Sequence, residues 1–253
     1  MGIKRYTANA DTTITNAYKA NLQTRGTGSN MGLADSLEVF HIYGQESSSS
    51  AENSRVLIDF PVATTITTDR SAGTIPASGS VSWFLRVHNV VHAGTLPKNY
   101  NMTISAISRS WDEGTGMDME GYTDSGSCNW TAAASSSGGV TAWTAAGGDY
   151  HASTTGSTAY FDNGTEDIEI DISHLVEEWI KGLSGGAKGD IYGVGIKMEN
   201  ESALSSSYTK KFSARGSQYF FNRPTLEARW DSATKDDRGN FYYSSSLAPA
   251  ADN

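Results

Sequence analysis

The feature that most constrains the fold is a period-two alternation of apolar and polar residues, which recurs along the chain. In segment 81–91 the apolar residues fall on one face of an extended chain: Val81, Trp83, Leu85, Val87 and Val91. The opposite face carries Ser82, Arg86 and His88. Because successive side chains of a β-strand point to opposite faces, this pattern predicts a strand between a core and water.

Strand patterns also occur at 36–43, 54–60, 101–108, 166–172, 191–198, 207–214 and 224–230. The residues expected to point inward in 191–198 and 224–230 are Tyr192, Val194, Ile196, Met198, Leu226, Ala228 and Trp230. Strands with one apolar face are typical of antiparallel sheets packed face to face. We therefore predict an all-β fold, an antiparallel β-sandwich of the jelly-roll type.

One segment departs from the alternation. Leu175, Val176, Trp179 and Ile180 recur at the spacing of a helix. Ser173 is placed to cap its start, and Gly182 is placed to end it. We predict one short helix over 173–181, lying across one end of the sandwich with Trp179 in the core.

Serine- and glycine-rich stretches at 47–51, 132–139 and 203–207 predict loops. After Trp230 the alternation stops and the sequence becomes polar. We expect a jelly-roll domain over 1–230, followed over 231–253 by a C-terminal extension or a linker to further domains.

The charge balance argues against nucleic acid as a partner. The formal net charge is −9, whereas a phosphate backbone is bound by clustered lysine and arginine. The nearest basic run, 208–216, holds only Lys210, Lys211 and Arg215, and we interpret it as the solvated face of a strand. No apolar run is long enough to span a membrane. The N-terminal residues lack a secretory signal, and Cys128 has no partner for an intrachain disulfide. We expect synthesis in the cytoplasm.

The stretch SWDEGTGMDMEGY (110–122) concentrates acidic residues among glycines. It has three interpretations: a solvated or interface loop, a structural Ca²⁺ site, or a catalytic carboxylate pair. The calcium candidates are Asp112, Glu113 and Asp118, although their spacing departs from an EF-hand loop. No second motif accompanies a catalytic pair, and no nucleophile elbow or phosphate loop occurs. We predict a chain that is not an enzyme and carries no cofactor, unless the second interpretation holds and the loop binds a structural Ca²⁺.

Aromatic residues in loop-rich sequence are the candidates for ligand or partner contact: Tyr122, Trp130, Trp143 and Tyr150. Such rings stack on sugars or anchor a protein partner. The alternative is that they pack the segment around them onto the sandwich. In the extension, Phe241, Tyr242 and Tyr243 form an apolar cluster that can anchor on a partner.

Six short motifs follow one another over residues 8–230: ADTTI, SRVLIDF, ISRSWDEGTG, IDISHLVEEWIKG, YGVGIKM and NRPTLEARW. Their order resembles the DNRLRE domain, a jelly-roll module similar to certain carbohydrate-binding modules. The chain departs from that family by lacking a signal peptide and by insertions around 61–80 and 115–160. The resemblance implies a non-catalytic module.

The segment from Tyr208 to Asn253 is similar to segments of structural proteins of tailed bacteriophages. This resemblance implies a virion protein in the head, neck or tail, which binds other virion proteins within an oligomeric assembly. The alternative is a carbohydrate-binding module that recognises a surface glycan. The two roles are compatible, because one fold can carry several binding sites.

Overall fold

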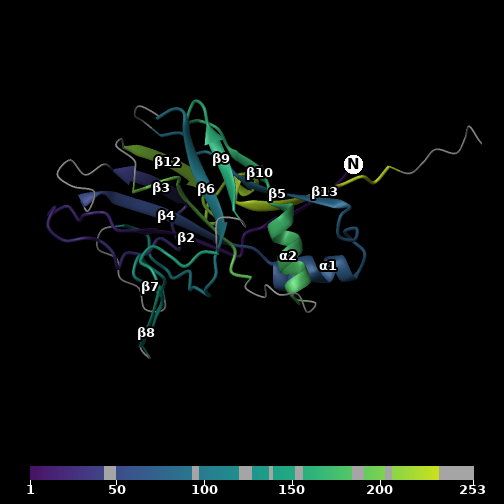
Figure 1. The fold of residues 1–253 in the computed structure, drawn as a ribbon, viewed down its shortest axis with the longest axis horizontal. Helices are drawn as coiled ribbons and strands as arrows, with labels where there is room; N and C mark the ends of the chain where they lie inside the picture. The colour runs from purple at the N-terminus through teal and green to yellow at the C-terminus, as the bar shows by residue number, and fades with distance from the viewer. Residues whose placement is uncertain are drawn as a thin grey trace, which may run out of the picture.

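The computed structural model describes residues 1–42, 50–92, 97–119, 127–136, 139–151, 156–183, 191–202 and 207–233. The chain forms an all-β antiparallel sandwich (Figure 1). The smaller sheet has the strand order β1 (Gly2–Thr7), β13 (Thr225–Trp230), β5 (Val81–Val87) and β10 (Ile168–Asp171). No helix among these described residues is long and apolar enough to cross a membrane.

The larger sheet contains strands from both halves of the chain. Its order is β12 (Tyr208–Ser213), β3 (Ser36–Ile42), β4 (Glu52–Asp59), β11 (Val194–Met198), β6 (Tyr100–Ala106) and β9 (Ser157–Phe161). A further strand, β2 (Ala10–Thr15), pairs with β4. The chain passes repeatedly from one sheet to the other, and the predicted antiparallel β-sandwich is confirmed.

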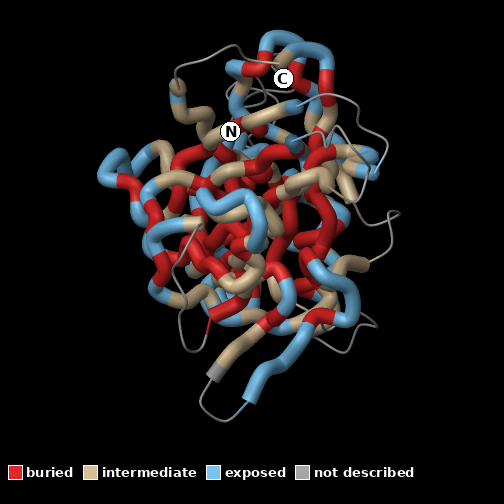
Figure 2. The backbone as a smooth tube through the Cα atoms, turned by 90° about the vertical axis from the view of Figure 1, so that its left-hand side faces the viewer, coloured by how far each residue is buried: buried red, intermediate tan, exposed pale blue. Residues whose placement is uncertain are grey.

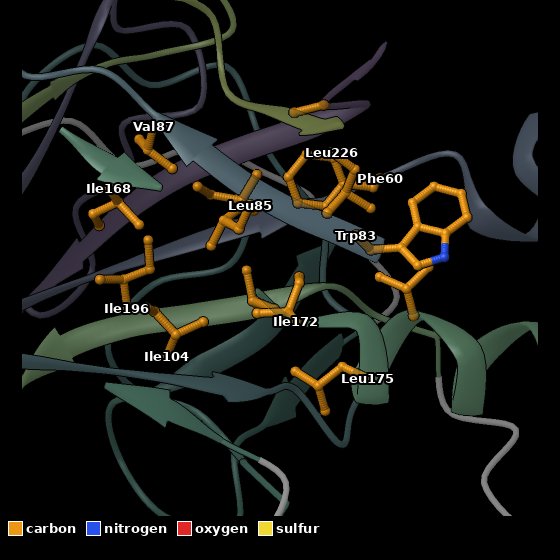
Figure 3. Packing of buried hydrophobic residues seen from close by; sticks show 14 of the residues in the cluster. Phe60, Trp83, Leu85, Val87, Ile104, Ile168, Ile172, Leu175, Ile196 and Leu226 are labelled. Atoms are coloured by element: carbon orange, nitrogen blue, oxygen red, sulfur yellow. The ribbon is translucent and has the colours of Figure 1, made fainter. Parts of the chain in front are cut away.

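The core lies between the two sheets and is built by the predicted alternation. Trp83, Leu85 and Val87 of β5 are fully buried. They face residues of the larger sheet, such as Ile104 and Ile196 (Figure 3). The prediction fails at the end of the segment, however, because Val91 was expected on the apolar face and is 90% exposed. The chain has left the smaller sheet by then, and the amide of Val90 donates to the carbonyl of Lys211 in β12.

The predicted helix is present as α2 (Ser173–Leu183) and runs past Gly182. Ser173 is the first residue of the helix and not the capping residue before it, and its hydroxyl accepts the backbone N–H of Trp83 at 2.7 Å. Trp179 is 3% exposed and belongs to the core, as predicted. Glu177 of the same helix accepts the indole N–H of Trp83 at 2.8 Å.

Helical structure also forms in a segment that the strand pattern did not identify. A π-helical turn, η2 (Val62–Ile66), leads into α1 (Thr67–Ser71), and both lie beside α2 at one end of the sandwich (Figure 1). Val62 and Ile66 are buried in the core. Arg70 of α1 forms a two-pronged ion pair with Glu177, with contacts of 3.1 and 2.5 Å. The insertion expected at 61–80 therefore closes this end of the core.

Two further predictions about local structure were wrong. The stretch 132–139, predicted as a loop, contributes to a hairpin of β7 (Ala132–Ser136) and β8 (Gly139–Ala142), which projects from the body (Figure 2). Lys210 is fully buried instead of solvated. Its ammonium donates to the Asn89 side chain and the Gly164 carbonyl at 2.7 and 2.9 Å, and burial lowers its pKa to about 8.

Candidate functional site

The acidic stretch wraps around a buried asparagine. The Asn30 amide donates to the carbonyls of Glu113 and Cys128 at 2.7 and 2.9 Å. Its side-chain oxygen accepts the backbone N–H groups of Gly32 and Gly116 at 3.0 and 2.9 Å. Each polar atom of this side chain has a partner, which is what a buried amide requires.

The glycines in this stretch are explained by close packing. A Cβ atom at Gly116 would lie 2.0 Å from the carbonyl oxygen of Asn30. At Gly114, where φ is +75°, a Cβ atom would lie 2.3 Å from the side chain of Ser127. No side chain fits at these distances, so the loop needs glycine to lie against the 30–32 segment.

Glu113 joins three segments that are distant in sequence. Its carboxylate pairs with the guanidinium of Arg215 at 2.6 and 3.1 Å and accepts the backbone N–H of Asp11 at 2.8 Å. The Asp11 carboxylate in turn accepts the backbone N–H of Arg215. We call Asp11, Glu113 and Arg215 the carboxylate clamp.

The clamp leaves little support for a calcium site. The oxygens of Glu113 already face a guanidinium and an amide, while Asp112 and Asp118 have exposed side chains. Within the described ranges, no group of three or more His, Cys, Asp and Glu side chains is arranged to hold a metal ion. The glycines that suggested a metal or catalytic loop serve the packing around Asn30.

We expect Asp11→Asn to change the pH dependence of stability. Burial, reinforced by the charge of Glu113, raises the Asp11 pKa from 3.8 to about 7. The folded state therefore binds this proton more tightly than the unfolded state, and the free energy of unfolding falls as pH rises through that window. In the wild type this decrease in the free energy of unfolding amounts to about 2–3 kcal/mol between roughly pH 5 and 8. Asp11→Asn should not show it, because asparagine does not ionise.

Urea unfolding across this pH range measures the effect, with the exposed Asp112→Asn as the control. Identical pH profiles for Asp11→Asn and the wild type would show that Asp11 does not hold its proton in the folded state.

Trp130 and Trp143 do not form an exposed platform. They are 7% and 5% exposed and pack in a second apolar cluster on the outer face of the larger sheet, with Ile14, Leu57, Ile107, Cys128 and Ala133. The indole N–H of Trp143 donates to the carbonyl of Asn129 at 2.8 Å. Their assignment as ligand contacts is therefore corrected to the packing alternative. Tyr122, Phe241, Tyr242 and Tyr243 lie outside the described residues.

Beside this cluster, the outer face of the larger sheet carries a polar groove centred on Arg55. The guanidinium of Arg55 lies 4.9 Å from the ring centre of Trp130. It pairs with Glu201 at 2.6 and 3.1 Å and donates to the Gly147 carbonyl at 2.8 Å. A Cβ atom at Gly147 would lie 2.5 Å from this guanidinium, which explains a glycine there. Burial opposes the charge on Arg55, yet its bonds to Glu201 keep its pKa raised.

Two adjoining pockets of about 600 and 870 Å³ make up the groove, and Arg55, Tyr150 and Lys197 line both. Tyr150 is half-buried and lies over Gly195, where a Cβ atom would be 2.2 Å from its ring. The Lys197 ammonium lies 5.3 Å from the centre of the same ring. Burial, and then the charge of Arg55, lower the Lys197 pKa. Hydroxyl groups of Thr103, Ser105, Ser157 and Thr158 extend the lining of the smaller pocket.

A third feature is an exposed aromatic turn before β13. Tyr219, Phe220 and Phe221 are 64%, 58% and 81% exposed. Their backbone is held by a 3₁₀ turn, η4 (Phe220–Asn222). Phe220 and Phe221 meet edge to face at 5.7 Å, and Arg223 lies 5.4 Å from the ring centre of Phe220. We call Tyr219, Phe220 and Phe221 the aromatic turn.

Sequence reasoning identified Tyr150 but missed Arg55, Lys197 and the aromatic turn as site candidates. The two basic residues sit at polar positions of alternating strands, where a solvated side chain is the ordinary expectation. A signal did exist for the turn, because three consecutive aromatic residues followed by Asn-Arg-Pro interrupt both strand and helix patterns.

No protein-family model matches this chain, and a search of curated proteins found no match.

Proposed function

We propose that this chain is a non-enzymatic structural protein of a tailed-bacteriophage virion, which binds other virion proteins through the aromatic turn. The observation that carries the proposal is the presence of three adjacent aromatic side chains, held out from the surface by a hydrogen-bonded turn. Clustered exposed aromatic residues are typical of protein interfaces, since they bury a large area at low entropic cost. The resemblance of residues 208–253 to phage structural proteins supports the same role.

The test is incorporation into particles. In a phage that encodes this chain, the triple variant Tyr219→Ser, Phe220→Ser and Phe221→Ser should fold normally and be lost from purified virions. Val91→Ser is the matched control, because Val91 is an exposed apolar residue in another part of the fold. Normal incorporation of the triple variant would show that the aromatic turn is not needed for assembly into the virion.

The second candidate function is recognition of a surface glycan in the polar groove. The observation that favours it is a lining of hydroxyl groups, paired charges and one half-buried tyrosine ring. Sugars are bound by hydrogen bonds to their hydroxyl groups together with contact against an aromatic face. Substituting Trp130 or Trp143 would not test this role, because both belong to the apolar cluster.

For the glycan role we expect Lys197→Ala to abolish binding on a glycan array while leaving the melting temperature nearly unchanged. Among the described contacts, the Lys197 ammonium has a ring contact with Tyr150 and no ion pair, so its removal should cost little stability. Lys98→Ala, at an exposed position, is the matched control. A glycan bound equally well by Lys197→Ala and by the wild type would exclude Lys197 from the binding site.

A further inference from the structure

The two ends of strand β13 carry features that complement each other. The aromatic turn immediately precedes the strand, which runs from Thr225 to Trp230. At the other end a surface hollow of about 490 Å³ opens on the outer face of the smaller sheet. A six-residue strand is about 20 Å long, so the projecting turn and the hollow are well separated on one molecule.

The hollow combines aromatic surface with polar edges. Phe84, which is half-buried, contributes its ring, while Ser80 and Ser82 contribute polar groups. The guanidinium of Arg229 lies 4.1 Å from the centre of the Phe84 ring. Trp230 is pressed against the first strand, where a Cβ atom at Gly2 would lie 2.3 Å from its ring. Figure 1 shows the N-terminus beside this end of β13. Trp230 packs against the core and so fixes the end of β13 that borders the hollow.

Charges near the two features are also complementary. Arg223 stands next to the aromatic turn, and its guanidinium lies against Phe220. Asp231 lines the hollow and has an exposed side chain. Arg229, the cation of the hollow, is already paired with Glu227 and Glu169, each at 2.6 Å. An incoming aromatic group accompanied by a guanidinium thus meets the Phe84 ring with the Arg229 guanidinium stacked on it, and a carboxylate.

We propose that the hollow receives the aromatic turn of a second copy of this chain. The inference rests on the proposed function, because it names the partner of the same turn. Donor and receptor are different surfaces of one molecule, so the contact is head-to-tail and not two-fold symmetric. Repetition of such a contact produces a closed ring or an open filament.

The size of the surfaces sets the expected strength. Three aromatic side chains exposed to this extent offer about 400 Å², and the matching area of the hollow brings the total to about 800 Å². This is below the size of a stable interface, so association should be reversible and dependent on concentration. A chain with net charge −9 also repels its copies, and moderate salt should strengthen the contact by screening that repulsion.

The test uses two variants that each remove one side of the contact. Phe220→Ser with Phe221→Ser removes the projecting rings, and Ser82→Trp fills the hollow from an exposed position on β5. Sedimentation of the wild type should show mass rising with concentration, and each variant alone should stay monomeric. An equimolar mixture should form one-to-one pairs and nothing larger, because one variant retains its hollow and the other its aromatic turn. Val91→Ser should associate like the wild type.

The remaining outcomes separate this inference from the proposed function. A wild-type chain that is monomeric at all concentrations, with residues 234–253 present or deleted, overturns the inference. A chain that associates only after their deletion assigns the hollow to its own C-terminal segment, which also overturns it. If the triple variant is lost from virions while the wild type stays monomeric, the turn binds a different virion protein and the proposed function stands. If the wild type self-associates while the triple variant is still incorporated normally into virions, the inference stands and the proposed role of the turn in assembly falls.

Discussion

Replacing Trp179 with alanine is expected to lower the free energy of unfolding by about 3–5 kcal/mol. The side chain is 3% exposed and packs in the main core with its helix neighbours Leu175, Val176 and Ile180. Alanine removes the whole indole and leaves a cavity, since the close-packed core around it cannot fully close onto the space. Urea unfolding followed by circular dichroism measures the loss of stability. The variant that remains folded should bind a protein partner or a glycan as well as the wild type does.

Glu178→Ala is the control for this prediction. Glu178 lies on the exposed side of the same helix, so its removal should change stability by less than about 0.5 kcal/mol. A Trp179→Ala protein as stable as the control, but deficient in binding a partner or glycan, would mean that the indole serves recognition and not the core.

Glu227→Gln is expected to lower the free energy of unfolding by about 3 kcal/mol at neutral pH. The Glu227 carboxylate is nearly buried on the smaller sheet and is paired with Arg5, Arg86 and Arg229. Although burial opposes its charge, the bonds from these guanidinium groups lower its pKa from 4.5 to about 2. Glutamine keeps the shape but leaves the arginine charges uncompensated, and removing one member of a buried ion network is costly.

The pH dependence supplies an independent check of the same residue. A lowered carboxyl pKa stabilises the fold fully above the unfolded value of 4.5, and this contribution is lost as pH falls toward 2. The wild type and Glu227→Gln should therefore approach each other in stability in acid. Glu169→Gln, whose side chain is 43% exposed, is the control and should cost less. An equal cost for Glu227→Gln at low and neutral pH would show that ionisation is not the cause.

The sequence predicted those parts of the fold that follow from repetition along one segment. The alternation of Val81, Trp83, Leu85 and Val87 and the helical spacing of Leu175 to Ile180 each report on local geometry, and the structure confirms both. The hairpin at 132–142 was missed because its alanines and serines carry no apolar contrast between faces. Lys210 was placed in water because its partners, Asn89 and Gly164, are distant in sequence.

The candidate sites depend on such distant contacts and were mostly beyond prediction. Arg55, Glu201 and the segment that holds both Gly147 and Tyr150 are far apart in sequence, and only the folded sheet brings them into one groove. The acidic stretch was difficult for the same reason. Its glycines can be explained only once Asn30 is seen inside the loop. By contrast, the aromatic turn is a continuous segment, and sequence alone could have drawn attention to it.

The pairing of the first strand with the last has a consequence for biosynthesis. β1 lies against β13, with Gly2 opposite Trp230, so β1 leaves the ribosome long before its partner. At about 5–20 residues per second, the wait is roughly 10–45 seconds. Closing a contact across so many residues also slows folding, because loop entropy must be overcome before the pair forms. During this interval β1 and the unfinished smaller sheet expose strand edges to other nascent chains. Chaperone binding during synthesis should therefore persist until Trp230 has emerged.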